Sequence, residues 1–232
     1  GGTDGAGDVL RRYAAGAPVR MRYLRQERAG LAKARNLGVH EAKGRYVLFM
    51  DVDVLGSPGL LERHVSAHQR YGKAGCFVGT ILMHPRITPG TLTRWFLPED
   101  QRKPRADEPL YFLDCQPSNM SLPRQLFLDM GGFSEVFRGS EFAGAELAWR
   151  LAKEGILSFL AGTAHGYIWL PADLEAERRR QYSRGYALFR LREITGSREI
   201  TRRYFLRRDP FRALLDAMVM PFYVRACQQS EQ

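Results

Sequence analysis

The stretch GRYVLFMDVD, residues 44–53, is the most informative part of the sequence for the fold. Its middle, Tyr46–Met50, is a continuous apolar run, which is typical of a strand covered on both faces in a parallel sheet. Asp51 and Asp53 follow directly. In extended chain, residues i and i+2 project to the same side, so we expect the two carboxylates to converge while Val52 and Val54 face the core. Hard cations such as Mg²⁺ or Mn²⁺ take such oxygen ligands, although paired Asp residues at a strand end also serve as turn or cap residues.

Helices and strands are predicted to alternate on both sides of this stretch. From the first residues to Met83, the expected elements are a helix at 8–15, a strand at 19–23, a helix at 30–42, the strand at 46–50, a helix from 57 to 72 and a strand at 76–83. This alternation predicts an α/β fold with a doubly wound, mostly parallel sheet flanked by helices. In such sheets ligands bind outside the carboxyl ends of the strands, which directs attention to Asp51–Val54.

The second half of the chain has a different pattern. Residues 84–109 are rich in proline and charge and predict a long loop, and loops of that length are usually functional or mobile. The elements expected after it are a strand at 118–122, helices at 124–130 and 145–153, a strand at 156–160, and helices at 173–193 and 209–227. We expect one domain over residues 1–170 and a basic helical extension over residues 171–232.

Composition narrows the class of protein. The chain has 232 residues, of which 44% are hydrophobic and 26% charged, and this balance excludes wholesale disorder and disulfide scaffolds. The three cysteines (76, 115 and 227) lie far apart, which fits free thiols in a reducing, cytoplasmic compartment. The net charge is +10, with Arg far more frequent than Lys. Arg forks suit phosphate, nucleic acid or anionic lipid, and a solvated helical face explains the excess equally well.

Five segments follow one another in an order that belongs to a known family. They are GTDG at 2–5, QERAGLAKARNLG at 26–38, GRYVLFMDVD at 44–53, NMS at 119–121 with GGF at 131–133, and ELAWRL at 146–151. In order and spacing they resemble the GT-A type glycosyltransferases of family 2, over roughly residues 1–190. The resemblance also implies a central first strand and an Asp upstream of residue 1, so we expect an N-terminally truncated member that is marginally stable by itself.

The resemblance implies a role for particular residues. Asp51 and Asp53, with His165, would hold Mg²⁺ or Mn²⁺; Asp4, Gly30, Arg35, Asn36 and Asp51 would bind the donor; Glu141 and Glu146 would be the catalytic carboxylates. The implied reaction is metal-dependent, inverting transfer of a sugar from a nucleotide-diphosphate donor to a glycan, a lipid-linked sugar or another hydroxyl acceptor. The usual acidic pair is replaced by Ala143 and Gly144, so the two Glu residues are alternatives that also suit a helix N-terminus.

Two rival functions remain open from the sequence. Ala143 and Gly144 are also compatible with a relative that binds a nucleotide-sugar or a glycan without transferring it. A nucleic-acid-binding domain is suggested by the basic charge, but the sequence has no recognisable motif for one, and no nucleic-acid partner is expected. The helices beyond residue 171 combine basic and apolar faces, which suits either peripheral contact with the inner face of a membrane or packing on the domain.

Overall fold

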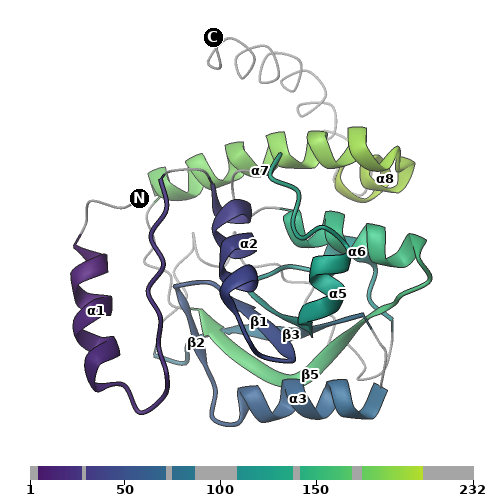
Figure 1. Ribbon diagram of the computed structural model, residues 1–232. Helices are drawn as coiled ribbons and strands as arrows, with labels where there is room; N and C mark the ends of the chain where they lie inside the picture. Colours follow the sequence, from purple (N-terminus) through teal and green to yellow (C-terminus); the bar gives the residue numbers. More distant parts are fainter. Residues whose placement is uncertain are drawn as a thin grey trace.

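A five-stranded sheet forms the centre of the computed structural model, which describes residues 5–27, 30–71, 75–86, 109–137, 142–168 and 174–205 (Figure 1). The strands lie in the order β1-β4-β3-β5-β2. Their bounds are β1 Tyr46–Met50, β2 Val54–Gly56, β3 Cys76–Met83, β4 Asn119–Pro123 and β5 Ser158–Ile168. The predicted α/β class, with helices flanking a sheet, is confirmed.

The sheet is mixed, and the expectation of a mostly parallel one is corrected. Strands β1, β3 and β5 share one direction, whereas β4 runs antiparallel to β1 and β3, and β2 runs antiparallel to β5. Among the described strands, only β3 and β5 form a parallel ladder, with Cys76 opposite Ser158. Helices cover both faces, so the apolar run in β1 arises whichever way its neighbour runs. Hydrophobicity therefore identified the strand but not its partner.

Helices lie on both faces of the sheet (Figure 1). Their bounds are α1 Ala6–Gly16, α2 Leu31–Glu41, α3 Leu60–Tyr71, the short 3₁₀ helix η1 Phe112–Asp114, α5 Arg124–Asp129, α6 Ala143–Lys153, α7 Leu174–Thr195 and α8 Arg198–Phe205. Helix α3 covers one face, and α2, α5 and α6 cover the other. The larger buried apolar cluster lies on the α2, α5 and α6 side, and a smaller cluster around Phe77 lies under α3.

The expected strand at 19–23 is wrong. Residues 17–27 run without helix or strand, and the side chains of Val19 and Tyr23 are 70% and 37% exposed. Alternating residues give a segment two different faces, but a strand also needs a neighbour that completes its hydrogen bonds. No described residue pairs with this segment in a ladder. Helix α1, just before it, likewise has no buried residue.

The carboxyl-terminal part packs on the same core. Leu188 and Leu191 of α7 and Ile200 of α8 are buried in the larger cluster. These contacts fit the interpretation that the late helices pack on the domain, while a boundary at residue 170 stays a prediction. Residues 87–108 of the predicted loop at 84–109 lie outside the described residues, as does the predicted helix at 209–227. Within the described part, no helix is both long and apolar enough to cross a membrane.

Candidate active site

The turn after β1 carries the two predicted metal-binding aspartates. The backbone N–H of Asp51 donates to the carbonyl of Ser118 at 3.3 Å, and the N–H of Val54 donates to the carbonyl of Asp51 at 3.1 Å. This closes a tight turn, so the extended alternation ends at Met50. The expectation that Val52 faces the core is therefore wrong, since its side chain is fully exposed. Asp51 and Asp53 are both half-buried.

Arg35 of α2 reaches the end of β1 and pairs with Asp51. Its Nη2 lies 2.5 Å from Asp51 Oδ1, and the exposed fractions of the two side chains are 8% and 27%. The guanidinium also lies over the ring of Phe133, 5.9 Å from its centroid. Burial lowers the pKa of Arg35, and the Asp51 charge opposes that shift. The sequence predicted both residues at the donor site, and the structure places them in direct contact.

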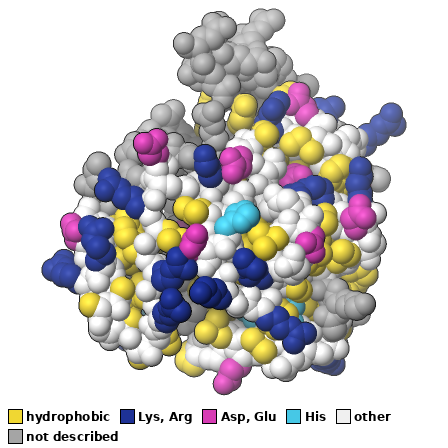
Figure 2. Space-filling view, viewed as in Figure 1, with side chains coloured by type: hydrophobic (Ala, Val, Ile, Leu, Met, Phe, Trp, Pro, Cys, Tyr) yellow, Lys and Arg dark blue, Asp and Glu magenta, His cyan; other side chains and the backbone are white. Residues whose placement is uncertain are grey.

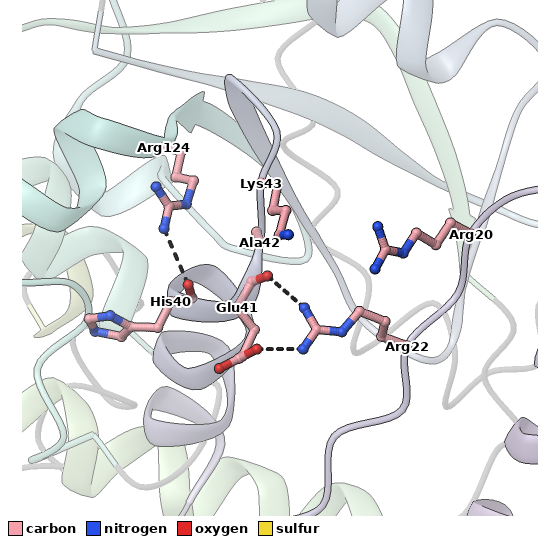
Figure 3. Close-up of a pocket in the computed structure, with 7 residues that line it drawn as sticks. All are labelled: Arg20, Arg22, His40, Glu41, Ala42, Lys43 and Arg124. Atoms are coloured by element: carbon pink, nitrogen blue, oxygen red, sulfur yellow. Dashed lines mark hydrogen bonds and ion pairs between the residues drawn. The ribbon is translucent and has the colours of Figure 1, made fainter.

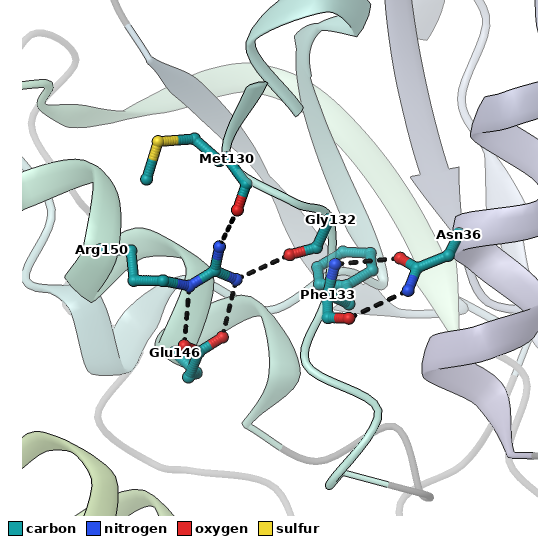
Figure 4. Close-up of polar contacts among 6 residues, drawn as sticks. All are labelled: Asn36, Met130, Gly132, Phe133, Glu146 and Arg150. Atoms are coloured by element: carbon teal, nitrogen blue, oxygen red, sulfur yellow. Dashed lines mark hydrogen bonds and ion pairs between the residues drawn. The ribbon is translucent and has the colours of Figure 1, made fainter. Parts of the chain in front are cut away.

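Gly30 and Asn36 place α2 against the rest of the site. Gly30 precedes the helix with φ of 90°, a conformation that glycine adopts without strain. Asn36 donates from Nδ2 to the carbonyl of Phe133 at 2.9 Å, and its Oδ1 accepts from the Phe133 N–H at 2.9 Å (Figure 4). The structure therefore shows Asn36 joining α2 to the turn 131–133. A direct contact between Asn36 and the sugar donor stays a prediction.

Glu146 is enclosed rather than open to a substrate. It is 4% exposed, and both its carboxylate oxygens accept from Arg150, at 2.7 and 2.8 Å. Arg150 also donates to the carbonyls of Met130 and Gly132, so α6 and α2 hold the turn 131–133 from opposite sides (Figure 4). This arrangement favours a structural role for Glu146, and its action as a catalytic carboxylate stays a prediction.

The first residues of α6 lie in the hydrophobic core. Phe142, Ala143 and Gly144 are buried, and Phe142 has a positive φ of 61°. A Cβ at Gly144 would lie 2.5 Å from the carbonyl oxygen of Cys115, which is closer than real contacts allow. An acidic side chain therefore has no room at position 144. The predicted residues Glu141 and Asp4 lie outside the described residues.

His165 lies within β5, not after it as predicted. It pairs with Thr80 in the ladder, and its carbonyl accepts from the Ser57 N–H at 3.0 Å. A register shift between Gly79 and Thr80 accompanies the longer course of β5. Among the described residues, no three His, Cys, Asp or Glu side chains gather as a metal-binding group. A metal-ligand role for His165 stays a prediction.

A separate basic hollow lies at the other end of β1. It is lined by Arg20, Arg22, His40, Glu41, Ala42, Lys43 and Arg124 (Figure 3). Arg22 pairs with Glu41 at 2.5 Å, and Arg124 donates to the last carbonyls of α2. Basic side chains gather on this face of the molecule (Figure 2). Because α2 ends here and Asp51 lies beyond the far end of β1, the hollow is distinct from the aspartate turn.

One polar cluster had no function in the sequence-based interpretation. His64 and His68 lie on the inner face of α3, and both are buried. They contact Asn119 and Ser121, which alternate along β4 and therefore share one face. The sequence did contain a signal for this cluster: two histidines stand four residues apart, on the side of the helix where apolar side chains are expected.

A mixed sheet between helical layers, with an Asp-x-Asp turn at the carboxyl end of β1, defines an α/β domain of the GT-A kind. The family model described as glycosyl transferase family 2 matches residues 1–130. The chain therefore belongs to glycosyl transferase family 2.

A curated relative agrees with that assignment, and solved structures agree with the fold. Validoxylamine A glucosyltransferase from Streptomyces hygroscopicus subsp. jinggangensis is 30% identical over 67% of this chain and 43% of its own length. The mannosyltransferase PcManGT from Pyrobaculum calidifontis, solved with GDP-Man and Mn²⁺, superposes with a TM-score of 0.53 at 18% identity, covering 81% of this chain and 52% of that one. GalNAc-T7 with UDP, GalNAc and Mn²⁺ gives 0.56 at 13% identity, covering 74% and 36%. These two structures support the fold. The chain spans less than half the length of the curated relative.

Proposed function

We propose that this chain transfers a sugar from a nucleotide-diphosphate sugar to a hydroxyl acceptor. Family membership and the name of the curated relative support sugar transfer as the reaction class. The observation that carries the proposal is the Asp51–Asp53 turn, held by Arg35 at the carboxyl end of β1. This is the edge of an α/β sheet where ligands bind.

The aspartate turn fits a divalent cation. Carboxylate oxygens are the ligands that Mg²⁺ and Mn²⁺ prefer, with phosphates and water completing the shell. Arg35 uses only Oδ1 of Asp51, and Asp53 follows two residues later. Two solved structures with this fold contain Mn²⁺. When bound, such a cation neutralises charge on the leaving diphosphate. Arg35 fixes the direction of the Asp51 carboxylate, and a contact between Arg35 and the donor phosphates is part of the proposal.

The transfer step needs a group that accepts a proton. The acceptor oxygen bonds to the anomeric carbon, the bond from that carbon to the diphosphate oxygen breaks, and its electron pair leaves with the nucleoside diphosphate. The hydroxyl proton passes to a carboxylate, and a single displacement inverts the anomeric carbon. We propose Glu141 as that base, since the position of Gly144 has no room for a side chain and Glu146 is occupied by Arg150.

A second candidate function is binding of a nucleotide-sugar or a glycan without transfer. The close contact between Gly144 and the Cys115 carbonyl favours it, because that contact excludes an acidic side chain from the aligned position of the base. Release of nucleoside diphosphate in the presence of Mn²⁺ and a hydroxyl acceptor separates the two. We expect release by the parent chain, and a loss of at least a hundredfold in Glu141→Gln, in line with general-base contributions. Donor binding without any release would establish the second candidate.

The site of action in the cell is a further part of the proposal. We propose a cytoplasmic protein whose late basic helices lie near the inner face of a membrane, supported by the excess of arginine in that part of the sequence. Flotation of the chain with anionic vesicles, compared with neutral vesicles, tests this.

A further inference from the structure

A chain of polar side chains crosses the interface between α3 and the sheet. His64 and His68 come from the inner face of α3, and Asn119 and Ser121 come from β4. Their exposed fractions are 3%, 1%, 0% and 1% respectively, so none of them can rely on bulk water. Buried polar groups need partners, and these four supply one another.

The distances form one continuous path. His68 Nε2 lies 2.9 Å from Ser121 Oγ, and Ser121 Oγ lies 2.8 Å from His64 Nδ1. His64 Nε2 lies 2.9 Å from Asn119 Oδ1. Asn119 Nδ2 then donates to the carbonyl oxygens of Ala164 at 2.9 Å and Thr80 at 3.4 Å. The path therefore runs from α3 through β4 to β5 and β3.

The chemistry of each group fixes the position of every proton. The Asn119 amide nitrogen faces two carbonyls, so Oδ1 faces His64 and can only accept. His64 must therefore carry its proton on Nε2. Its Nδ1 is then an acceptor, which the Ser121 hydroxyl fills by donating. The same hydroxyl oxygen accepts from His68, which must carry its proton on Nε2 as well. Both histidines are neutral in this arrangement.

A further proton has no place in the path. Protonation of His64 Nδ1 would present two donors to Ser121 Oγ and leave the hydroxyl proton without an acceptor. His68 Nδ1 is buried and has no hydrogen-bond partner in the described part of the chain. Burial lowers the pKa of His64, while the Asn119 hydrogen bond opposes that shift. Burial, together with the charges of His64 and Arg45, lowers the pKa of His68 to about 4.

In the part of the chain that the structure describes, the elements around His64 and His68 offer no carboxylate to a protonated histidine. From β1, the ring of Tyr46 stacks on His68 with centroids 4.2 Å apart, and Arg45 precedes it. From β3, Phe77 meets His68 edge-on at 4.7 Å. On β5, the nearest titratable residue in sequence to the path is His165, which directly follows Ala164, whose carbonyl accepts from Asn119. Among the described residues, neither His64 nor His68 forms an ion pair with a carboxylate.

The path ends beside the aspartate turn. Asn119 is the first residue of β4 and lies opposite Met50, the last residue of β1. The preceding carbonyl, that of Ser118, accepts from the Asp51 N–H. Anchoring Asn119 to Thr80, Ala164 and His64 therefore fixes the carbonyl on which the first residue of the turn rests.

We propose that His64 is a positioning residue for the Asp51–Asp53 turn. Buried and neutral, it donates from Nε2 to Asn119 and so holds Ser118 and the turn; a second proton on Nδ1 conflicts with Ser121 and favours an open arrangement in which His64 leaves the path and no longer holds Asn119. The link to donor binding rests on the proposed function, whereas the link to the turn does not. His64→Gln is the informative variant, because an amide can still donate to Asn119 but does not titrate. His64→Leu removes the donor, and His40→Gln on the exposed face of α2 is the matched control.

The test measures protection of the Asp51 amide against hydrogen exchange between pH 8 and pH 5. In the parent and in His40→Gln, we expect protection to fall by up to about tenfold per pH unit as one proton is taken up. His64→Gln should lose less protection than the parent across this range, because His68 is then the one histidine of the path that still takes up a proton, and His64→Leu should be low throughout. Imidazole ¹⁵N shifts should report Nε2–H forms for both histidines at pH 8. A fall in His64→Gln equal to that of the parent, or an Nδ1–H form of His64, would overturn the inference.

Binding of UDP with Mn²⁺ gives a second readout. The ratio of the Kd of His64→Gln to that of the parent, taken at each pH, cancels protonation of the nucleotide itself. We expect a ratio near one at pH 8 and a ratio below one at pH 5. A ratio that stays constant with pH contradicts the link from His64 to the donor site. If the parent binds no nucleotide at any pH, the proposed function fails for UDP while the amide protection still decides the role of His64.

Discussion

Arg35 Nη2 and Asp51 Oδ1 lie 2.5 Å apart, and this contact joins helix α2 to the end of strand β1. Two residues that are 16 positions apart in sequence thus meet at the carboxyl end of β1. The buried guanidinium is stable there because the carboxylate compensates for lost water, and the carboxylate keeps one direction because Arg35 holds it.

We expect the Arg35–Asp51 pair to be energetically coupled. Arg35→Met leaves a half-buried carboxylate without its cation, and Asp51→Asn leaves a buried cation without its anion. Each change should cost about 1–3 kcal/mol in the free energy of unfolding. In a double-mutant cycle the interaction energy should exceed about 0.5 kcal/mol. Urea unfolding provides the measurement. Additive effects would show that the contact has no energetic weight.

The link from Asn36 to Phe133 should matter for stability. Asn36→Ala removes two hydrogen bonds and leaves the backbone N–H and carbonyl of Phe133 unsatisfied, so we expect a loss of about 1–3 kcal/mol. Lys33→Ala on the exposed side of the same helix is the control and should change stability by less than about 0.5 kcal/mol. Thermal unfolding followed by circular dichroism measures both. Equal unfolding midpoints for Asn36→Ala and the parent would mean that the turn 131–133 does not need Asn36.

Glu146 should act through Arg150 rather than on the substrate. Glu146→Gln weakens the two contacts that hold Arg150 against the carbonyls of Met130 and Gly132, so stability should fall. At a temperature where the variant is still folded, its rate of nucleoside diphosphate release should stay within about threefold of the parent. A loss of a hundredfold or more in a fully folded Glu146→Gln would assign it a catalytic role.

Glycine 144 offers a direct test of the packing of α6. Gly144→Ala should destabilise the chain by at least about 1–3 kcal/mol, because the new Cβ meets the Cys115 carbonyl at 2.5 Å. Gly38→Ala is the matched control: that position in α2 is open, and alanine should stabilise the helix by up to about 1 kcal/mol. Chemical denaturation of both variants gives the comparison. A neutral Gly144→Ala would reopen position 144 to a side chain.

Acid should destabilise the folded chain through His68. Its pKa lies at about 4 in the folded state and near 6.5 when unfolded, so the unfolded chain takes up the proton first. The contribution of His68 is complete above pH 6.5 and is lost as the pH falls from there to about 4. The loss amounts to at most about 1.4 kcal/mol per pH unit. Unfolding free energies of the parent and His68→Gln between pH 8 and pH 4 measure it. If the unfolding free energy depends on pH in the same way in the parent and in His68→Gln, His68 is not responsible for the acid destabilisation.

The sequence predicted the elements better than their pairing. The run 46–50 and the strand 76–83 appear at their predicted bounds because a continuous apolar run between polar boundaries identifies a buried strand. The same signal carries no information on the direction of a neighbouring strand, so the antiparallel position of β4 was missed. Residues 19–23 have the right alternation but no described partner, and alternation alone does not make a strand.

The sequence predicted which residues belong to the site better than it predicted their contacts. Asp51 and Arg35 were identified from motifs, but their mutual contact depends on how α2 packs on β1, which spacing in sequence does not specify. Glu146 and Asn36 belong to the same motifs, yet both side chains are used to hold the turn 131–133. The histidine path was missed because polar residues on an inner stripe become meaningful only when β4 supplies their partners.

The central claim is tested most directly by calorimetric titration of the chain with nucleotide-sugars in the presence of Mn²⁺. A panel of UDP- and GDP-linked sugars is titrated into the parent, Asp53→Asn and the matched control Asp129→Asn, an exposed residue of α5. We predict that at least one donor binds the parent and Asp129→Asn with equal affinity and needs the metal to do so. Asp53→Asn should bind that donor at least tenfold more weakly while remaining folded at the temperature of the titration. Equal affinity in all three proteins, or binding indifferent to Mn²⁺, would contradict the assignment of the aspartate turn as the metal and donor site.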